Sequence, residues 1–188
     1  MWNVDQQTLD GLKAGDPCAW ERVLSFCRRQ VFNIAYSFVG CADDAEDLAQ
    51  EALLQVYRRI SSFRGDSDLS TWVYRVTVNV CVGKLRRRRP QPASLEEIGA
   101  DSVVQIEDPS PRVLESEQQG IVRRAVAELP PKLSAPVILH YFQGLNYEQI
   151  AEVLGLPLGT VKSRINRAKM LLKDRLRDYV LCEEVERA

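Results

Sequence analysis

A basic segment near the C-terminal end offers the clearest chemistry in the sequence. In residues 158–176, hydrogen-bond donors recur on one side of a helical pattern, and Val161 and Ile165 mark the opposite, apolar side. The donors are Lys162, Ser163, Asn166 and Arg167. Side chains of these types read base edges in the major groove of duplex DNA, and neighbouring cations attract phosphates. The pattern predicts a DNA-binding helix, and the alternative is a solvated basic helix in a plain bundle.

A shorter predicted helix precedes the basic one. Asn146 and Gln149 form a capping-box pair for a helix over residues 147–154. Gly155 then allows a tight turn, and the small Ala151 allows two helices to approach closely. A short helix, a turn with glycine and a second helix make a helix-turn-helix.

Residues 63–79 interleave aromatic side chains with polar ones. Aromatic rings can stack on unpaired bases, and polar side chains can hydrogen-bond the base edges. The polar side chains of the segment include those of arginine, serine, threonine and asparagine. An enclosed loop beside them could hold a base taken out of the stack. The alternative is that Phe63, Trp72 and Tyr74 are ordinary core aromatics.

A run of cations follows this segment. It consists of Lys84, Arg86, Arg87, Arg88 and Arg89. Positive charge at this density attracts phosphates. The run is also compatible with a solvated helix end, because the helix dipole favours cations at the C-terminus.

Residues 43–51 are acidic and begin a predicted helix. A metal site here would need partner ligands, and no Glu-x-x-His motif or second acidic cluster supplies them. We therefore expect no metal site. The acidic face is better explained as a docking surface for a basic partner, and the alternative is a solvated first turn.

Apolar residues at three- and four-residue steps predict the helices that carry these motifs. Asp16 is expected to cap a helix that begins with Pro17 and ends at Gly40, and a second helix follows over residues 45–60. Residues 69–89 alternate in part like a strand, but their length and the lack of a second strand to pair with favour a helix.

The helix before the helix-turn-helix is less regular. Ser134 is expected to cap it, with Pro136 in its first turn and Gly144 at its end. A proline is tolerated in a first turn because its missing N–H would have no partner there.

The middle of the chain divides these helices into two groups. Residues 90–111 contain four prolines and five acidic residues but no lysine or arginine. Prolines break helices and like charges repel, so this composition predicts an extended linker. The sequence thus predicts an all-α protein with two helical domains, residues 1–89 and 112–188. The alternative is that the loop folds against one continuous domain.

Cysteine and histidine usage excludes several kinds of site. The 188 residues contain one histidine, His140, and five scattered cysteines without a CxxC pair. This composition argues against a zinc finger, a disulfide framework or histidine-based catalysis. Cys27, Cys41 and Cys81 fall in apolar stripes, where buried, inert thiols are usual. Only Cys18 and Cys182 are candidates for redox chemistry.

The overall composition is that of an ordinary globular protein. The formal net charge is −1, no run of about 18 apolar residues predicts a membrane span, and the first residues lack a signal-peptide pattern. We expect a cytoplasmic protein that is not an enzyme, has no cofactor and does not insert into membranes.

Taken in order, the motifs resemble those of bacterial extracytoplasmic-function (ECF) sigma factors of the sigma-70 family. Residues 44–51 resemble the region that docks on polymerase in that family, and residues 63–79 resemble the segment that recognises and melts the −10 element. Residues 129–131, 144–151 and 159–164 resemble the helix-turn-helix that binds the −35 element. Gly83 stands where an acidic residue is frequent in the family, and Pro136 lies in a helix often written without it.

The resemblance implies a sigma-2 domain, a sigma-4 domain and an alternative transcription initiation factor. By match to the family, the four donors of the basic helix would touch the −35 element. The residues that would lie at or near the unpaired −10 strand are Arg64, Ser70, Thr71, Trp72 and Asn79. Contacts to core RNA polymerase would come from Leu48, Gln50, Glu51 and Leu54.

The expected partners are promoter DNA, core RNA polymerase through its β′ clamp helices and β flap, and an inhibitory anti-sigma factor. Such an inhibitor would hold the protein at the inner face of the membrane. The acidic linker would suit a channel lined with cations. The alternative function is a helix-turn-helix regulator that does not engage polymerase.

Overall fold

The computed structural model describes residues 2–88 and 117–186, and their side chains over 2–87 and 120–177. This described part is entirely helical apart from turns and loops, which confirms the all-α prediction. Its α-helices are α1 (Gln6–Ala14), α2 (Pro17–Val39), α3 (Ala42–Arg59), α4 (Leu69–Arg88), α5 (Glu117–Ala127), α6 (Pro131–Val137), α7 (Tyr147–Leu154) and α8 (Leu158–Glu186). A short 3₁₀ segment, Ile60–Ser62, follows α3, and a π-helical segment, Ile138–Phe142, follows α6.

The N-terminal helices begin and end where their local signals predict. The Asp16 carboxylate accepts a hydrogen bond from the Cys18 amide at 3.1 Å, and Pro17 opens α2. Gly40 ends this helix with a φ of 71°, a left-handed conformation that glycine adopts without strain. Helix α1 lies outside the helices predicted above, although Asp5 caps it by accepting from the Thr8 amide at 2.7 Å.

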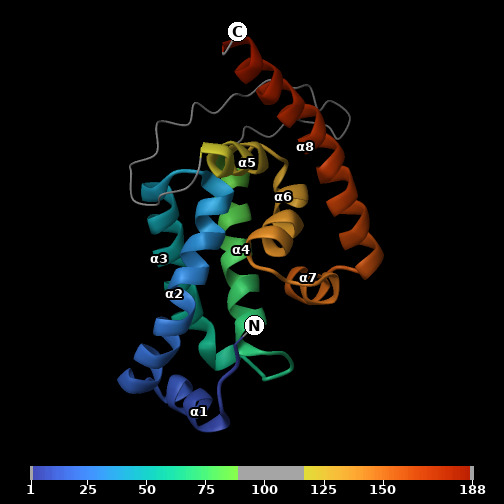
Figure 1. The fold of residues 1–188 in the computed structure, drawn as a ribbon. Coiled ribbons are helices and arrows are strands. Elements are labelled where there is room, and N and C mark those ends of the chain that lie inside the picture. The colour runs from blue at the N-terminus through green and yellow to red at the C-terminus, as the bar shows by residue number, and fades with distance from the viewer. Residues whose placement is uncertain (1, 89–116, 187–188) are drawn as a thin grey trace.

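Helix α4 confirms the choice of a helix over a strand and explains why its pattern was mixed. Val76, Thr77 and Val78 are consecutive, and all three are buried. The helix contacts α2 and α3 of its own half and also α6 and α7 of the other half (Figure 1). A helix packed on several sides carries apolar residues in several directions, so its sequence loses the single stripe of a surface helix.

The C-terminal pair also follows its local signals. The Asn146 side chain accepts from the Gln149 amide at 2.8 Å, and the Gln149 side chain accepts from the Asn146 amide at 2.9 Å. This reciprocal capping box opens α7, and Gly155 ends the helix with a φ of 63°. Helix α8 then begins at Leu158, as predicted.

The start of α6 was predicted wrongly. Ser134 does not cap this helix, because α6 begins at Pro131 and Ser134 is buried inside it. Pro136 therefore lies near the end of α6, where its ring nitrogen has no hydrogen to donate to the preceding turn. The chain continues from there as the π-helical segment. A proline at the first helical position is the signal that marks the true start.

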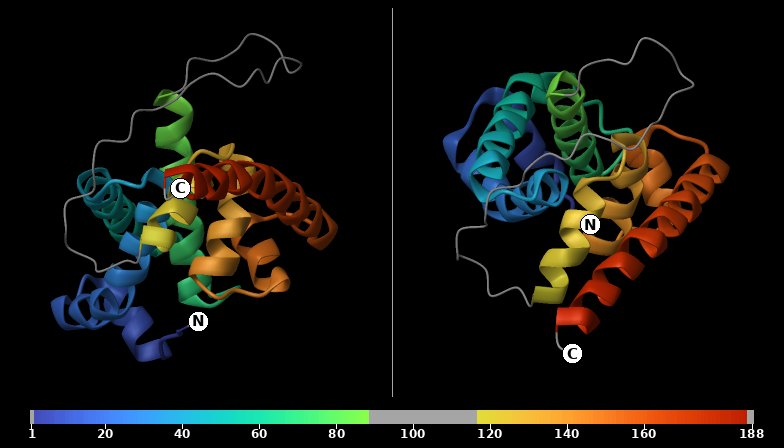
Figure 2. Two further views of the ribbon diagram at one scale, coloured as in Figure 1. Left: turned by 45° about the horizontal axis from the view of Figure 1, so that its top comes forward. Right: turned by 90° about the horizontal axis from the view of Figure 1, so that it is seen from above.

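The two helical groups pack against each other in the described part of the chain. Helix α2 contacts α5 and α6, and α4 contacts α6 and α7, so one apolar cluster runs through both groups. Figure 2 shows α5, α6 and α7 packed against the N-terminal helices, with α8 on their outer side. The predicted linker, residues 90–111, lies outside the described residues, and the domain boundaries stay predictions.

The buried cysteines behave as predicted, with one exception. Cys27 and Cys81 are buried, and desolvation raises the pKa of Cys27 to about 11 and that of Cys81 to about 12 from an ordinary value of 9.0. Cys41 is only half-buried, because it lies at the N-terminal end of α3, directly before the first helical residue. Cys18 is exposed, and the side chain of Cys182 lies outside the described residues.

Thiol labelling tests this burial. In the folded protein at pH 8, we expect Cys18 to react with a maleimide, while Cys27 and Cys81 stay unmodified because their thiols are protonated and shielded. Labelling of all thiols at equal rates without denaturant would contradict the burial.

The raised pKa values of Cys27 and Cys81 also make stability depend on pH. The native state keeps protons on these thiols which the unfolded state loses above pH about 9. The free energy of unfolding should therefore fall as the pH rises from there towards 11.

Candidate nucleic-acid interface

The first half of α8 presents a donor-rich face. Val161 and Ile165 are completely buried on one side of the helix. On the other side, Lys162, Ser163, Asn166 and Arg167 are all exposed. The helix-turn-helix fixes this orientation, because the Gly155 amide and the Leu156 amide close the turn with carbonyls of α7 at 3.3 Å and 3.0 Å. The arrangement leaves four hydrogen-bonding side chains free to meet a groove of duplex DNA.

The loop before α4 and the helix itself hold the second candidate group. Arg64 is exposed in the loop, and Asn79 is exposed on the helix. Trp72 is half-buried, with its ring centroid 5.6 Å from that of Phe63 at a tilt of 52°. The spacing of three and four residues places Trp72, Arg75 and Asn79 on one face of α4. Arg75 was not among the predicted site residues.

Two of the predicted −10 residues point inward. Ser70 and Thr71 are both fully buried at the start of α4. The Ser70 hydroxyl has no hydrogen-bond partner among the described residues. In this structure Ser70 and Thr71 are therefore not accessible to a DNA strand, whereas the exposed Arg64 and Asn79 are.

The end of α4 carries part of the predicted basic run. Lys84, Arg86 and Arg87 are exposed. The side chain of Arg88 and the whole of Arg89 lie outside the described residues. Three exposed cations on the last turns of one helix suit both the helix dipole and a phosphate backbone.

An exposed face of α3 combines polar and apolar side chains. Gln50 and Glu51 are exposed, and Leu54 is 48% exposed. Leu48 is only 4% exposed, so it packs into the core and cannot itself offer a surface. Tyr57, one turn beyond Leu54, is 55% exposed and packs on Trp20 with ring centroids 4.8 Å apart. The sequence reasoning missed Tyr57, although its helical spacing from Leu54 could have indicated it.

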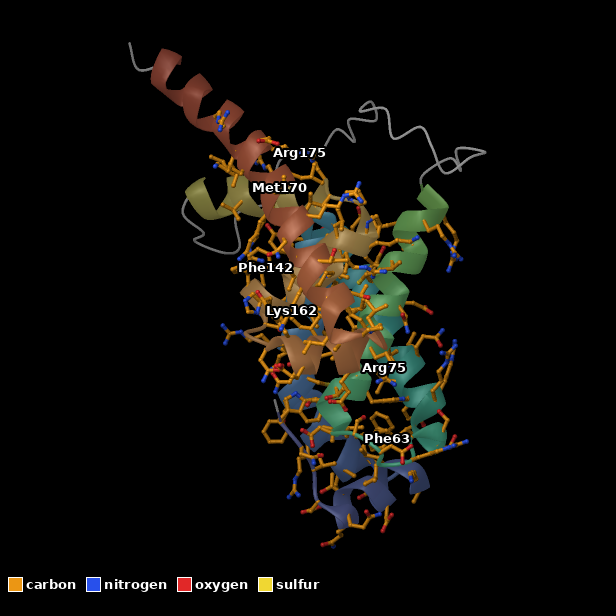
Figure 3. All side chains as sticks on the ribbon, turned by 90° about the vertical axis from the view of Figure 1, so that its right-hand side faces the viewer. Phe63, Arg75, Phe142, Lys162, Met170 and Arg175 are labelled. Atoms are coloured by element: carbon orange, nitrogen blue, oxygen red, sulfur yellow. The ribbon has the colours of Figure 1, made fainter. Side chains whose placement is uncertain are left out.

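Arg75 joins the α4 face to the helix-turn-helix. Its guanidinium donates to the backbone carbonyl of Glu152 at 2.6 Å and to that of Val153 at 3.2 Å (Figure 3). These carbonyls belong to the last turn of α7, where the helix dipole favours a cation. The first helix of the helix-turn-helix therefore rests on the same face of α4 as Trp72 and Asn79.

A second arginine joins the two helical groups at α5. The Arg123 guanidinium lies 4.6 Å from the ring centroid of Phe142 and 5.6 Å from that of Tyr36. It also donates to the Ser37 hydroxyl on α2 at 2.9 Å. Cation–π contacts and a hydrogen bond thus connect α5, the π-helical segment and α2.

The described residues show neither a candidate metal site nor a candidate membrane span. Among them, no group of three or more histidine, cysteine or acidic side chains could hold a metal ion. Within the same ranges, no helix is long and apolar enough to cross a membrane.

Known protein families match both halves of the chain. Residues 26–91 match sigma-70 region 2, and residues 119–172 match sigma-70 region 4. The RNA polymerase sigma-H factor of Pseudomonas aeruginosa is 35% identical over 88% of this chain and 90% of its own length. The ECF RNA polymerase sigma-E factor of Escherichia coli is 32% identical over 94% of this chain and 96% of its own length.

The chain belongs to the ECF sigma factors. This membership confirms the family that the motifs indicated, and it makes the protein a transcription initiation factor rather than an enzyme. The region 2 match contains both the α3 face and the α4 face, and the region 4 match contains the donor-rich face of α8.

Solved structures with a similar fold support this architecture. CnrH, solved in complex with the cytosolic domain of CnrY, covers 93% of this ECF sigma factor at a TM-score of 0.67 and 19% identity. The sigma factor RpoE from Bartonella quintana, solved in complex with the anti-sigma factor NepR, covers 84% at a TM-score of 0.63 and 23% identity. Their similarity supports the two-part helical fold.

The Arg123 contact gives a test of how the two halves of this sigma factor are held together. We expect Arg123→Ala to loosen the packing of α5 against α2, because it removes two cation–π contacts and a hydrogen bond. The radius of gyration from small-angle scattering should rise, and the free energy of unfolding should fall by about 1–3 kcal/mol. Arg124→Ala is the matched control, because Arg124 is its exposed neighbour on the same helix. Equal radii for the two variants would contradict a joining role for Arg123.

Proposed function

We propose that this ECF sigma factor binds core RNA polymerase through α3 and directs it to promoters through two separate DNA contacts. Helix α8 reads the −35 element as a duplex, and the loop and exposed face of α4 read the unpaired −10 strand. The observation that carries the proposal is the exposed donor face of α8, whose opposite side is completely buried. The order of the matched regions along the chain supports the division of labour.

The −35 contact follows from the chemistry of α8. Lys162 and Arg167 can each donate to guanine edges, and Asn166 can pair with adenine, while other cations of the helix neutralise phosphates. Phosphate contacts set the position of the helix in the groove, and base contacts set which sequence it prefers. The proposed reading helix therefore combines general attraction to DNA with discrimination among promoters.

Replacement of Arg167 tests the −35 contact. We expect Arg167→Ala to weaken binding of the polymerase complex to a promoter duplex by about 1–3 kcal/mol if this side chain contacts a base. If it contacts a phosphate, the salt dependence of binding should become shallower instead. Arg177→Ala is the control, because Arg177 is also exposed on α8 but lies beyond the first half. Identical promoter affinities and salt slopes for both variants would rule out the proposed reading face.

The −10 contact uses the α4 side of the molecule. Arg64 is placed to meet a phosphate or a base, Trp72 offers an aromatic face, and Asn79 offers an amide. Helix α7 rests on this side of α4 through Arg75, so a DNA strand that lies along it would compete with α7. Promoter engagement is therefore expected to change the packing between the two helical groups.

The polymerase contact is assigned to the exposed face of α3. Glu51 supplies negative charge and Leu54 supplies apolar surface, while the buried Leu48 holds the helix in place. Such a mixture of charge and exposed leucine suits a protein interface, where charge guides encounter and apolar burial supplies affinity. The expected partner surface is that of the β′ clamp helices.

Truncation of Leu54 tests this assignment. Leu54→Ala should weaken binding to a β′ clamp-helix fragment by about 1–3 kcal/mol, because apolar area is no longer buried on binding. The side chain is half exposed, so the fold should tolerate the change. Val122→Ala is the control, because Val122 is an exposed apolar residue on α5. Unchanged affinity in Leu54→Ala, measured by isothermal titration calorimetry, would place the polymerase contact elsewhere.

We also propose that an anti-sigma factor holds this protein inactive. The two structural neighbours were solved with partners, one of which is called an anti-sigma factor. Helix α8 and the π-helical segment expose Met170, Leu171 and Tyr141, which offer apolar surface to such a partner. Cytoplasmic location, with retention at the inner membrane face by the inhibitor, is part of the same proposal.

Run-off transcription with bacterial core polymerase tests the function as a whole. Transcripts that depend on this protein and share two spaced promoter motifs are the expected result. The alternative is a helix-turn-helix regulator that does not engage polymerase. That function would be favoured if core polymerase failed to bind the folded protein while promoter-like duplexes still did.

A further inference from the structure

The segment ahead of α1 lies against the start of α4. The Asn3 side-chain amide donates to the Asp68 carboxylate at 2.8 Å, across 65 residues of sequence. The Asn3 side-chain oxygen accepts from the Val4 amide at 2.9 Å and from the Leu69 amide at 3.5 Å. Figure 1 shows the N-terminal end of the chain beside the beginning of α4.

The residues on either side of Asn3 hold this segment in place. The Trp2 ring stacks on that of Phe26, with centroids 6.4 Å apart and planes 25° apart. Trp2 and Val4 are both partly buried against the apolar core. Asn3 is therefore presented to Asp68 by two anchored neighbours rather than by a free chain end.

The loop between α3 and α4 is consequently fixed at both ends. At one end, Phe63 is buried and packs against Trp72. At the other end, Asp68 is bound by Asn3, and its backbone carbonyl accepts from the Trp72 amide at 3.2 Å. Between these ends, residues 64–66 are exposed, and Gly65 reverses the chain with a φ of 83°.

We propose that Asn3 is a positioning residue for −10 recognition, which holds the loop of residues 64–67 open for an unpaired base by fixing Asp68. This inference rests on the proposed function of the loop and of Trp72. A loop that already has its bound shape loses less conformational entropy when the DNA strand arrives. Asn3 itself need not touch DNA, since it acts through Asp68 on the loop and on Trp72.

The proposed role differs from a general contribution to stability. The bond between Asn3 and Asp68 is exposed to solvent, and one hydrogen bond is a small part of the free energy of unfolding of a whole protein. Its loss would therefore act mainly on the local shape of the loop. Neither the α3 face nor the donor-rich face of α8 involves Asn3, so polymerase binding and −35 binding serve as internal references.

The test uses the full-length protein bound to core polymerase. The probes are a single-stranded oligonucleotide with the −10 sequence of a promoter identified by run-off transcription, and a duplex with its −35 sequence. We expect Asn3→Ala to weaken binding of the −10 strand by about 3- to 10-fold, as the loss of one hydrogen bond implies, with the −35 duplex and polymerase bound as before. Gln6→Ala is the matched control, because Gln6 donates to Asp10 at the same 2.8 Å on the surface of α1.

Two further variants identify the bond itself. Asn3→Asp keeps the shape and the acceptor oxygen but loses the donor, so it should weaken −10 binding at least as much as Asn3→Ala. Asp68→Ala should also weaken it, and the double variant Asn3→Ala with Asp68→Ala should be no weaker than Asp68→Ala alone. Additive losses would show that the two residues act independently and would overturn the proposal.

Discrimination between bases of the −10 strand separates a positioning role of Asn3 from a general effect on stability, which would not alter it. Changing one base of the −10 oligonucleotide at a time should weaken binding to the wild-type complex, and Asn3→Ala should reduce this discrimination. Equal loss for all oligonucleotides and for the −35 duplex would indicate a folding defect and overturn the proposal. If wild type discriminates and Asn3→Ala does so equally well, Asn3 has no positioning role. If wild type itself does not discriminate, the proposed function of the loop fails first.

Discussion

The burial of α4 by both helical groups is the constraint on which the rest of the structure depends. Helices α2 and α3 pack on it from one half of the chain, and α6 and α7 pack on it from the other. Few of its positions remain at the surface, and Asn79 is one of them. The helix thus forms the centre of the fold and also carries the side chains assigned to the −10 strand. Because α7 packs on this helix, a movement of α7 would change the packing at the centre and the surroundings of those side chains.

Features set by neighbouring residues could be predicted from the sequence. The capping of α2 by Asp16 and the capping box of α7 each depend on contacts within three residues, and both were found where expected. The donor-rich face of α8 was also predictable, because Val161 and Ile165 lie one helical turn apart and indicate which side of the helix is buried. Leu48, Ser70 and Thr71 were chosen by family resemblance, which says nothing about burial.

Features set by distant residues could not be predicted. Asn3, Arg75 and Arg123 find their partners 65, 78 and 86 residues away along the chain. No local pattern indicates such contacts, because the sequence around a polar residue on a helix surface is the same whether solvent or another helix covers that residue. The prediction of the start of α6 was wrong for a different reason. Ser134 is a good capping residue, but Pro131 offers an earlier helix start.

The contact between Arg75 and α7 has a consequence for how this protein can diverge. Both acceptors are main-chain carbonyl oxygens, which every residue type possesses. Changes in the side chain of Glu152, which is exposed, leave the acceptor in place as long as α7 keeps its last turn. The sequence requirement therefore falls on the arginine alone, and the outer surface of α7 is free to drift towards new partners while the two halves of the molecule stay in contact.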